Sequence, residues 1–281
     1  MLNQIKTALL LASLTAILLL IGVLLGGQSG LIIAFGLALA MNFFSYWYSD
    51  KIVLKLYRAQ PAEVSKYPRL HQIVNEIARA SKIPKPKIYI VPTETPNAFA
   101  TGRNQKHAAI AVTKGICDLL SEDELKGVLS HEAAHIKNKD ILISTVAATI
   151  AGAISFLAIM ARWAAIFGGF GGRGRDRGIA ELLILAIVAP LIALVIRLAI
   201  SRSREYLADE SGAKAIHKPL ALAAALEKLE KGAKAHPFKF GNESTSHMFI
   251  INPFSKSFFL NLLSTHPPVK ERIARLKHLK V

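Results

Sequence analysis

The chain has 281 residues but only one cysteine, Cys117. A single cysteine rules out an internal disulfide and fits a thiol-tolerant compartment. Its neighbours, Gly115-Ile116-Cys117-Asp118, offer no partner base, so a role as core filler is favoured over one as a nucleophile.

Acidic residues are also few, with 19 Asp and Glu against 35 Lys and Arg. Hydrophobic residues make up 52% of the chain. This combination fits a membrane protein with basic flanks better than a soluble basic protein. Aromatic residues are sparse at 7% and do not interleave with basic ones in a recognisable nucleic-acid module, so no nucleic-acid partner is expected.

Long apolar runs are abundant instead, and the first two adjoin. Thr7 to Gly27 is long enough to cross a bilayer of about 30 Å. A short Gly-Gly-Gln-Ser-Gly turn then leads into a second run, Leu31 to Tyr48. This arrangement predicts a transmembrane hairpin over residues 1–48 rather than a cleaved signal peptide.

The charges around this hairpin indicate its orientation. Lys6 precedes it, Lys51, Lys55 and Arg58 follow it, and the turn has no Lys or Arg. By the positive-inside rule, both ends of the hairpin are expected in the cytoplasm.

Two further apolar runs, 141–161 and 179–198, form a second pair within residues 141–200. Basic residues flank both ends of this pair, so they do not determine its topology. A buried or re-entrant hairpin remains one interpretation. Full spans are favoured because each run has bilayer length. The expected total is therefore about four transmembrane helices.

Residues 49–140 have the composition of a soluble domain. Apolar periodicity predicts a helix from Tyr67 to Ser81, and short strands are predicted over 87–91, 98–102 and 107–113. Ser121 and Glu124 form a capping box that predicts the start of another helix. The fold expected is α+β, predominantly helical, with a small β-sheet.

The predicted helix after Ser121 carries His131, Glu132 and His135. The two histidines lie one turn apart on one face, so both imidazoles can reach a single metal ion. Glu132 is placed to take a proton from a metal-bound water. This is the HExxH pattern of zinc peptidases, although a solvated His-Glu-His face would show the same spacing.

A catalytic zinc needs a third protein ligand and an open position. Glu205 and Asp209 share a helix face, which makes Glu205 a candidate ligand and Asp209 a candidate partner for a ligand imidazole. Spacing alone leaves another interpretation open, an acidic pair that offsets Arg202 and Arg204.

Several motifs in order resemble the HtpX family of membrane-embedded zinc endopeptidases, relatives of the CAAX prenyl endopeptidases. They are Pro96-Asn-Ala-Phe-Ala-Thr-Gly102, the HExxH helix, Ser201-Arg-x-Arg-Glu-Tyr-x-Ala-Asp209 and Thr265-His-Pro-Pro268. The resemblance implies a gluzincin-type catalytic domain with one Zn²⁺ per chain, held by His131, His135 and Glu205. It implies that Glu132 is the general base.

The resemblance also implies two substrate contacts. Residues Asn97, Ala98, Phe99, Ala100 and Thr101 would form an edge strand that pairs with an extended substrate. His266 and Arg272 would stabilise the oxyanion that develops at the scissile carbonyl. The alternative for these two residues is a proline-capped helix start with a surface arginine. Family members usually carry a bulkier apolar residue where this chain has Ala133 and Ala134.

Together these observations predict a multi-pass zinc endopeptidase of a prokaryotic cytoplasmic membrane. Its catalytic domain comprises residues 49–140 and 201–281, with the active site and both termini in the cytoplasm. Its implied substrates are misfolded or damaged membrane proteins or other unfolded polypeptides. A metal-binding scaffold without proteolysis is the alternative, although one cysteine suits a structural zinc site poorly. A transporter would need ionisable groups at mid-membrane, where these runs are apolar.

Overall fold

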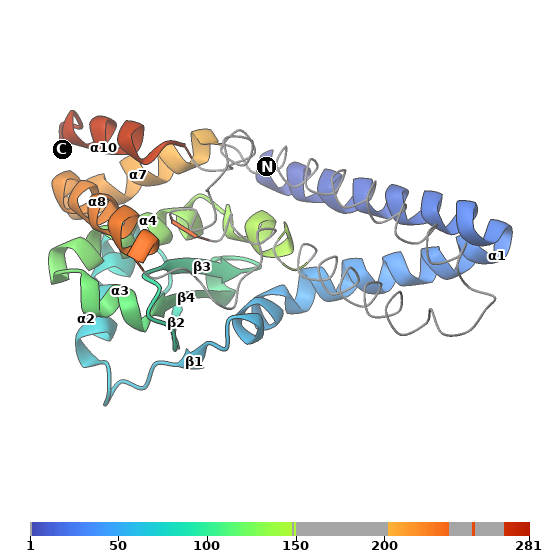
Figure 1. Ribbon diagram of the computed structural model, residues 1–281, viewed down its shortest axis with the longest axis horizontal. Helices are drawn as coiled ribbons and strands as arrows, with labels where there is room; N and C mark the ends of the chain where they lie inside the picture. The colour runs from blue at the N-terminus through green and yellow to red at the C-terminus, as the bar shows by residue number, and fades with distance from the viewer. Residues whose placement is uncertain (1, 148, 150–201, 236–248, 251–266) are drawn as a thin grey trace.

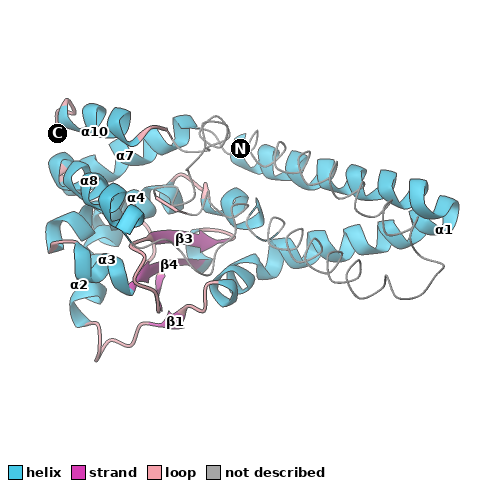
Figure 2. Cartoon of the chain, in the orientation of Figure 1, coloured by secondary structure: helices cyan, strands magenta, loops and turns pink. Residues whose placement is uncertain are grey.

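The computed structural model describes residues 2–147, 149, 202–235, 249–250 and 267–281. A long helical hairpin extends from one side of a helical domain that contains a small sheet (Figure 1). The described chain is mostly helical, with one four-stranded mixed sheet (Figure 2). This confirms the mainly helical fold with a small sheet.

The hairpin is α1, Leu2–Leu56, whose two helices meet at Gly27 with φ 55° and ψ −135°. A positive φ favours glycine because it lacks a Cβ. Asn42 Nδ2 donates to Thr15 Oγ1 across the hairpin at 2.9 Å. The segments Ile5–Val23 and Gly26–Leu56 are each long and apolar enough to cross a membrane. The predicted helical hairpin is therefore present, with its turn within the predicted Gly-Gly-Gln-Ser-Gly segment, and its second helix extends beyond Tyr48 to Leu56.

The sheet has the order β1-β2-β4-β3. Its strands are β1 (Gln60–Pro61), β2 (Lys87–Val91), β3 (Ala98–Gly102) and β4 (Ala108–Thr113). β2 runs parallel to β4, whereas β3 is antiparallel to β4. Three strands match the prediction, and the two-residue β1 is too short to carry a sequence signal. In this sheet β3 is an edge strand.

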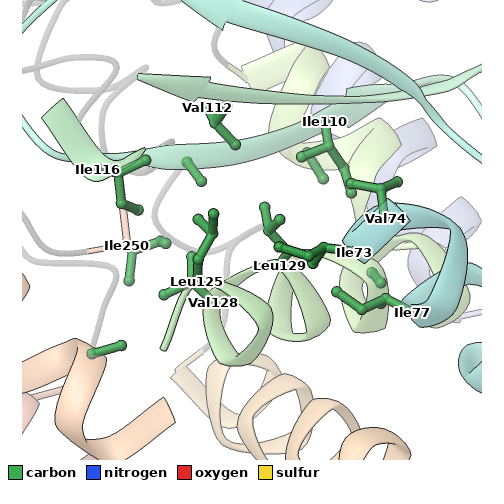
Figure 3. Close-up of a cluster of buried hydrophobic side chains, with 14 of the residues drawn as sticks. Ile73, Val74, Ile77, Ile110, Val112, Ile116, Leu125, Val128, Leu129 and Ile250 are labelled. Carbon is green, nitrogen blue, oxygen red and sulfur yellow. The ribbon is translucent and has the colours of Figure 1, made fainter. Parts of the chain in front are cut away.

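Every residue of β4 is buried, but alternate side chains face different layers. Ile110 and Val112 pack with residues of α2 (Pro68–Ser81) and α4 (Glu122–Lys137), as Figure 3 shows. Ala109 and Ala111 instead pack with Tyr57, which directly follows α1, and with Phe99 of β3. The small alanine side chains leave room for these rings.

Helix α4 lies at the centre of the domain, in contact with α2, α7 (Arg202–Ile216), α8 (Pro219–Ala235) and β3. It begins as predicted, because the Ser121 backbone N–H donates to Glu124 Oε2 at 2.8 Å. Other helices of the described chain are the 3₁₀ helix η1 (Gln105–His107), the short α3 (Lys114–Leu119) and the C-terminal α10 (Val269–Lys277). Of the predicted third span, residues 141–147 are helical, and residues 148 and 150–161 lie outside the described residues, as does the fourth span.

Candidate metal centre

The two histidines of α4 converge at one point. Their rings are perpendicular with centroids 4.7 Å apart, and the two Nε2 atoms are separated by 3.1 Å. His131 is fully buried and His135 is half-buried. The helical spacing of four residues thus places two nitrogen donors side by side.

Helix α7 brings Glu205 to the same point. Its Oε2 lies 3.6 Å from His131 Nε2, and its Oε1 lies 3.5 Å from His135 Nε2. The two helices approach closely because α7 carries Gly212 at their contact. A Cβ at that position would lie 2.8 Å from the backbone N of His131.

These three residues fit a zinc ion. A tetrahedral ion 2.0–2.2 Å from each ligand atom separates the ligand atoms by about 3.3–3.6 Å. The observed separations are 3.1, 3.5 and 3.6 Å. Two imidazole nitrogens and one carboxylate are also a donor set that zinc favours.

Each ligand histidine presents its other ring nitrogen to a carboxylate. His131 Nδ1 lies 2.9 Å from Asp209 Oδ1, and His135 Nδ1 lies 3.3 Å from Asp140 Oδ2. Such contacts hold the ring orientation and tautomer that metal binding needs. Burial alone would lower the pKa of His131, but its hydrogen bonds to Asp209 and Glu205 raise that pKa to about 9.

Arg272, from α10, is fully buried behind His131. Its Nε and Nη2 donate to the two carboxylate oxygens of Asp209 at 2.8 and 2.7 Å. Its Nη1 donates to the Ile250 carbonyl at 3.0 Å. Burial would raise the pKa of Asp209, but the charge and hydrogen bonds of Arg272 lower it to about 2. Arg272 therefore keeps Asp209 ionised opposite His131.

Glu132 points toward the edge strand. Its Oε2 accepts a hydrogen bond from the Ala100 backbone N–H at 2.7 Å. Burial raises the pKa of Glu132 above its ordinary value, which is the direction expected for a general base. The backbone N–H of Ala100 therefore points away from β4 and toward α4. This places the outer edge of β3 next to Glu132, the candidate general base.

The other residues of the predicted strand segment have distinct partners. Asn97 accepts at Oδ1 from the Ile250 backbone N–H at 3.1 Å. The Thr101 hydroxyl lies 3.1 Å from that of Thr145, which is also 3.3 Å from the Gly102 backbone N. Ala98 and Phe99 are buried, the first in the main core and the second against Tyr57.

Six of the predicted site residues thus surround one point: His131, Glu132, His135, Glu205, Asp209 and Arg272. His266 lies outside the described residues. Sequence reasoning missed Asp140. Its signal was its position directly before the third apolar run, where an N-cap residue is expected. The resemblance implied that Arg272 stabilises the oxyanion at the scissile carbonyl. In the structure its side chain donates to Asp209 and to the backbone carbonyl of Ile250.

A HExxH helix whose histidines meet a glutamate from a second helix defines a metal-dependent peptidase. The chain belongs to peptidase family M48, whose family model matches residues 65–280. This confirms the predicted enzyme class, a zinc metallopeptidase with a His131, His135 and Glu205 site.

Similar proteins agree with this family. The chain is 55% identical over 277 residues to the protease HtpX homolog of Thermococcus sibiricus, covering 98% of this chain and 95% of that protein. It is 56% identical over 280 residues to the protease HtpX homolog of Persephonella marina, covering 98% of this chain and 96% of that protein. The predicted resemblance to the HtpX family is therefore confirmed.

The fold resembles that of Ste24p from S. mikatae, known from a crystal structure. The TM-score is 0.53 at 17% sequence identity, and the match covers 99% of this chain. The chain spans 65% of the length of that protein, and at 17% identity the likeness concerns the fold alone.

Proposed function

We propose that this protein is a membrane-bound zinc endopeptidase that cleaves misfolded or damaged membrane proteins at the cytoplasmic face. The observation that carries the proposal is the hydrogen bond between Glu132 and Ala100 beside the three converging metal ligands. It joins a metal site, a proton-transfer group and a strand edge, which are the parts that peptide hydrolysis requires.

The bound ion is proposed to be one Zn²⁺ per chain, held by His131, His135 and Glu205. When bound, zinc supplies Lewis acidity that polarises a water and the scissile carbonyl. Asp209 and Asp140 hold the two imidazoles in the orientation that binds the ion.

The protein groups carry the proton transfers. Glu132 takes the proton of the attacking water and later delivers it to the leaving amine. The backbone edge of β3 at Asn97–Thr101 pairs with an extended substrate, which brings the scissile bond beside Glu132. His266 is proposed to stabilise the oxyanion, whereas Arg272 holds Asp209 in place.

The proposed arrangement in the membrane follows the sequence. Residues 1–48 form one transmembrane hairpin and residues 141–200 a second, in a prokaryotic cytoplasmic membrane. The two catalytic segments, 49–140 and 201–281, lie in the cytoplasm. Two candidate spans in α1 support the first of these hairpins.

The test compares zinc content and casein hydrolysis of the detergent-purified chain with those of Glu132→Gln. We expect zinc in both and hydrolysis only in the unmodified chain. Equal turnover in the two proteins would refute the role of Glu132. Glu205→Ala should lose zinc affinity, and normal zinc content in that variant would mean that another residue completes the site.

A further inference from the structure

Trp47 marks a definite depth along α1. The second helix of the hairpin begins after Gly27, and a helix of about 20 residues spans a hydrocarbon core of about 30 Å. A helix that enters the core at Gly27 therefore leaves it near Trp47. The side chains of Tyr46, Trp47 and Tyr48 are exposed, as in an interfacial aromatic belt.

The turn between β3 and β4, residues 103–107, reaches this level. The Arg103 guanidinium lies over the Trp47 ring, 4.6 Å from its centroid. Farther along α1, the Lys51 ammonium lies 5.2 Å from the centroid of Tyr48. The turn therefore shares the depth of the aromatic belt, although it belongs to the catalytic domain (Figure 1).

A third element adds charge at the same place. Gln105 Nε2 donates to the Lys137 carbonyl at 3.0 Å, which joins the turn to the end of α4. We call the basic side chains of these three elements the interfacial basic surface: Lys51, Arg103, Lys106, Lys137 and Lys139. Four of them are exposed and Arg103 is half-buried. Of the nearby acids, Asp50 is half-buried and Asp140 is buried against His135.

We propose that the interfacial basic surface binds the headgroups of anionic phospholipids. Lys and Arg side chains at a membrane surface attract anionic lipids, and the aromatic belt sets their depth. The inference rests on the proposed insertion of α1 but not on proteolysis. Because the turn directly follows β3, bound lipid holds the edge strand at the membrane surface.

The test uses Trp47 as the reporter. The chain has two tryptophans, so Trp163→Phe leaves Trp47 alone in the full-length protein. This protein is reconstituted into phosphatidylcholine vesicles that contain brominated phosphatidylglycerol or brominated phosphatidylcholine in equal amounts. Fluorescence is normalised to the same variant in unbrominated vesicles, and the two quenching curves give the relative affinity of the site for the anionic lipid.

We expect phosphatidylglycerol to be preferred by about fivefold, the effect of one basic side chain at a membrane surface. Arg103→Gln/Lys106→Gln removes the two charges of the turn beside Trp47 and should reduce this preference, whereas an unchanged preference in that variant would contradict the inference. The matched control, Arg79→Gln/Lys85→Gln on and after α2, removes the same charge from exposed residues that are not part of the interfacial basic surface and should retain the preference. High salt should weaken the preference for phosphatidylglycerol in the Trp163→Phe protein, which is the parent of these variants.

Three further outcomes would overturn the inference, and they differ in what they imply. Equal quenching by both brominated lipids in the parent means that Trp47 lies in the membrane but the basic surface selects no anionic lipid. Absence of quenching by either lipid means that Trp47 is not at the membrane, which also refutes the proposed insertion of α1. An equal loss of preference in the control variant would attribute the effect to net charge alone.

Discussion

Arg272 and Asp209 form a two-point ion pair in the interior, with N–O distances of 2.8 and 2.7 Å. Arg272 belongs to α10 and Asp209 to α7, so the pair ties the C-terminal helix to the metal site. Asp209 in turn contacts His131, which makes the orientation of a metal ligand depend on the last helix of the chain.

This pair should behave as a unit in stability measurements. Arg272→Met leaves the Asp209 carboxylate buried without its cation, which should destabilise the fold by about 3–5 kcal/mol. Arg272→Met combined with Asp209→Leu removes both charges. The double variant should lose less free energy of unfolding than the sum of the losses in the two single variants. Denaturant unfolding in detergent measures the three variants, and strictly additive losses would contradict the coupling.

Asp140 should matter for metal affinity. Asp140→Asn keeps a residue type that is favoured at helix N-termini but removes the charge that faces His135 Nδ1. We expect zinc affinity to fall by about 10- to 100-fold, as for other residues that orient a ligand histidine. Competition with a chromophoric chelator measures the affinity. Asp118→Asn, on the exposed side of α3, is the control, and an equal loss there would contradict a specific role.

The close contact of α4 and α7 should not tolerate a larger side chain. In Gly212→Ala the added methyl would lie 2.8 Å from backbone atoms of Ser130 and His131, so the helices must separate. This displaces Glu205 from the histidines, and we expect lower stability, by about 1–3 kcal/mol, together with weaker zinc binding. Ser211→Ala, at the half-buried neighbouring position, is the control. Unchanged zinc affinity in Gly212→Ala would show that the site adapts.

Cys117 should be a slow nucleophile in the folded protein. Burial raises the pKa of its thiol from 9.0 to about 11, and the nearby Asp118 carboxylate adds to this effect. At pH 8 the thiolate fraction should be about 100-fold lower than in the unfolded chain, and it should rise as the pH approaches 11. A thiol-specific chromogenic reagent measures the rates. Equal rates before and after denaturation would contradict the raised pKa.

Local features of the sequence predicted the elements that carry the site. The apolar periodicity of α2, the Ser121–Glu124 capping box of α4 and the glycine turn of the hairpin depend on neighbouring residues, and all three are observed. The HExxH spacing likewise placed His131 and His135 on one helix face. Spacing made Glu205 a candidate ligand and Asp209 a candidate partner of a ligand imidazole, but it also suits a solvated acidic pair, and the resemblance was needed to assign Glu205.

The sequence by itself therefore determined α2, α4, the hairpin and the two histidine ligands, since each depends on residues within a few turns of one another. Tertiary structure decided the rest. Only packing shows that Arg272 pairs with Asp209, that Asp140 faces His135 and that Ala100 donates to Glu132. For Arg272 and Ala100, the partners come from different elements, whose relative placement depends on close contacts such as that at Gly212. Asp140 reaches back to His135 only because the chain turns where α4 ends. No periodicity in the sequence encodes these distances.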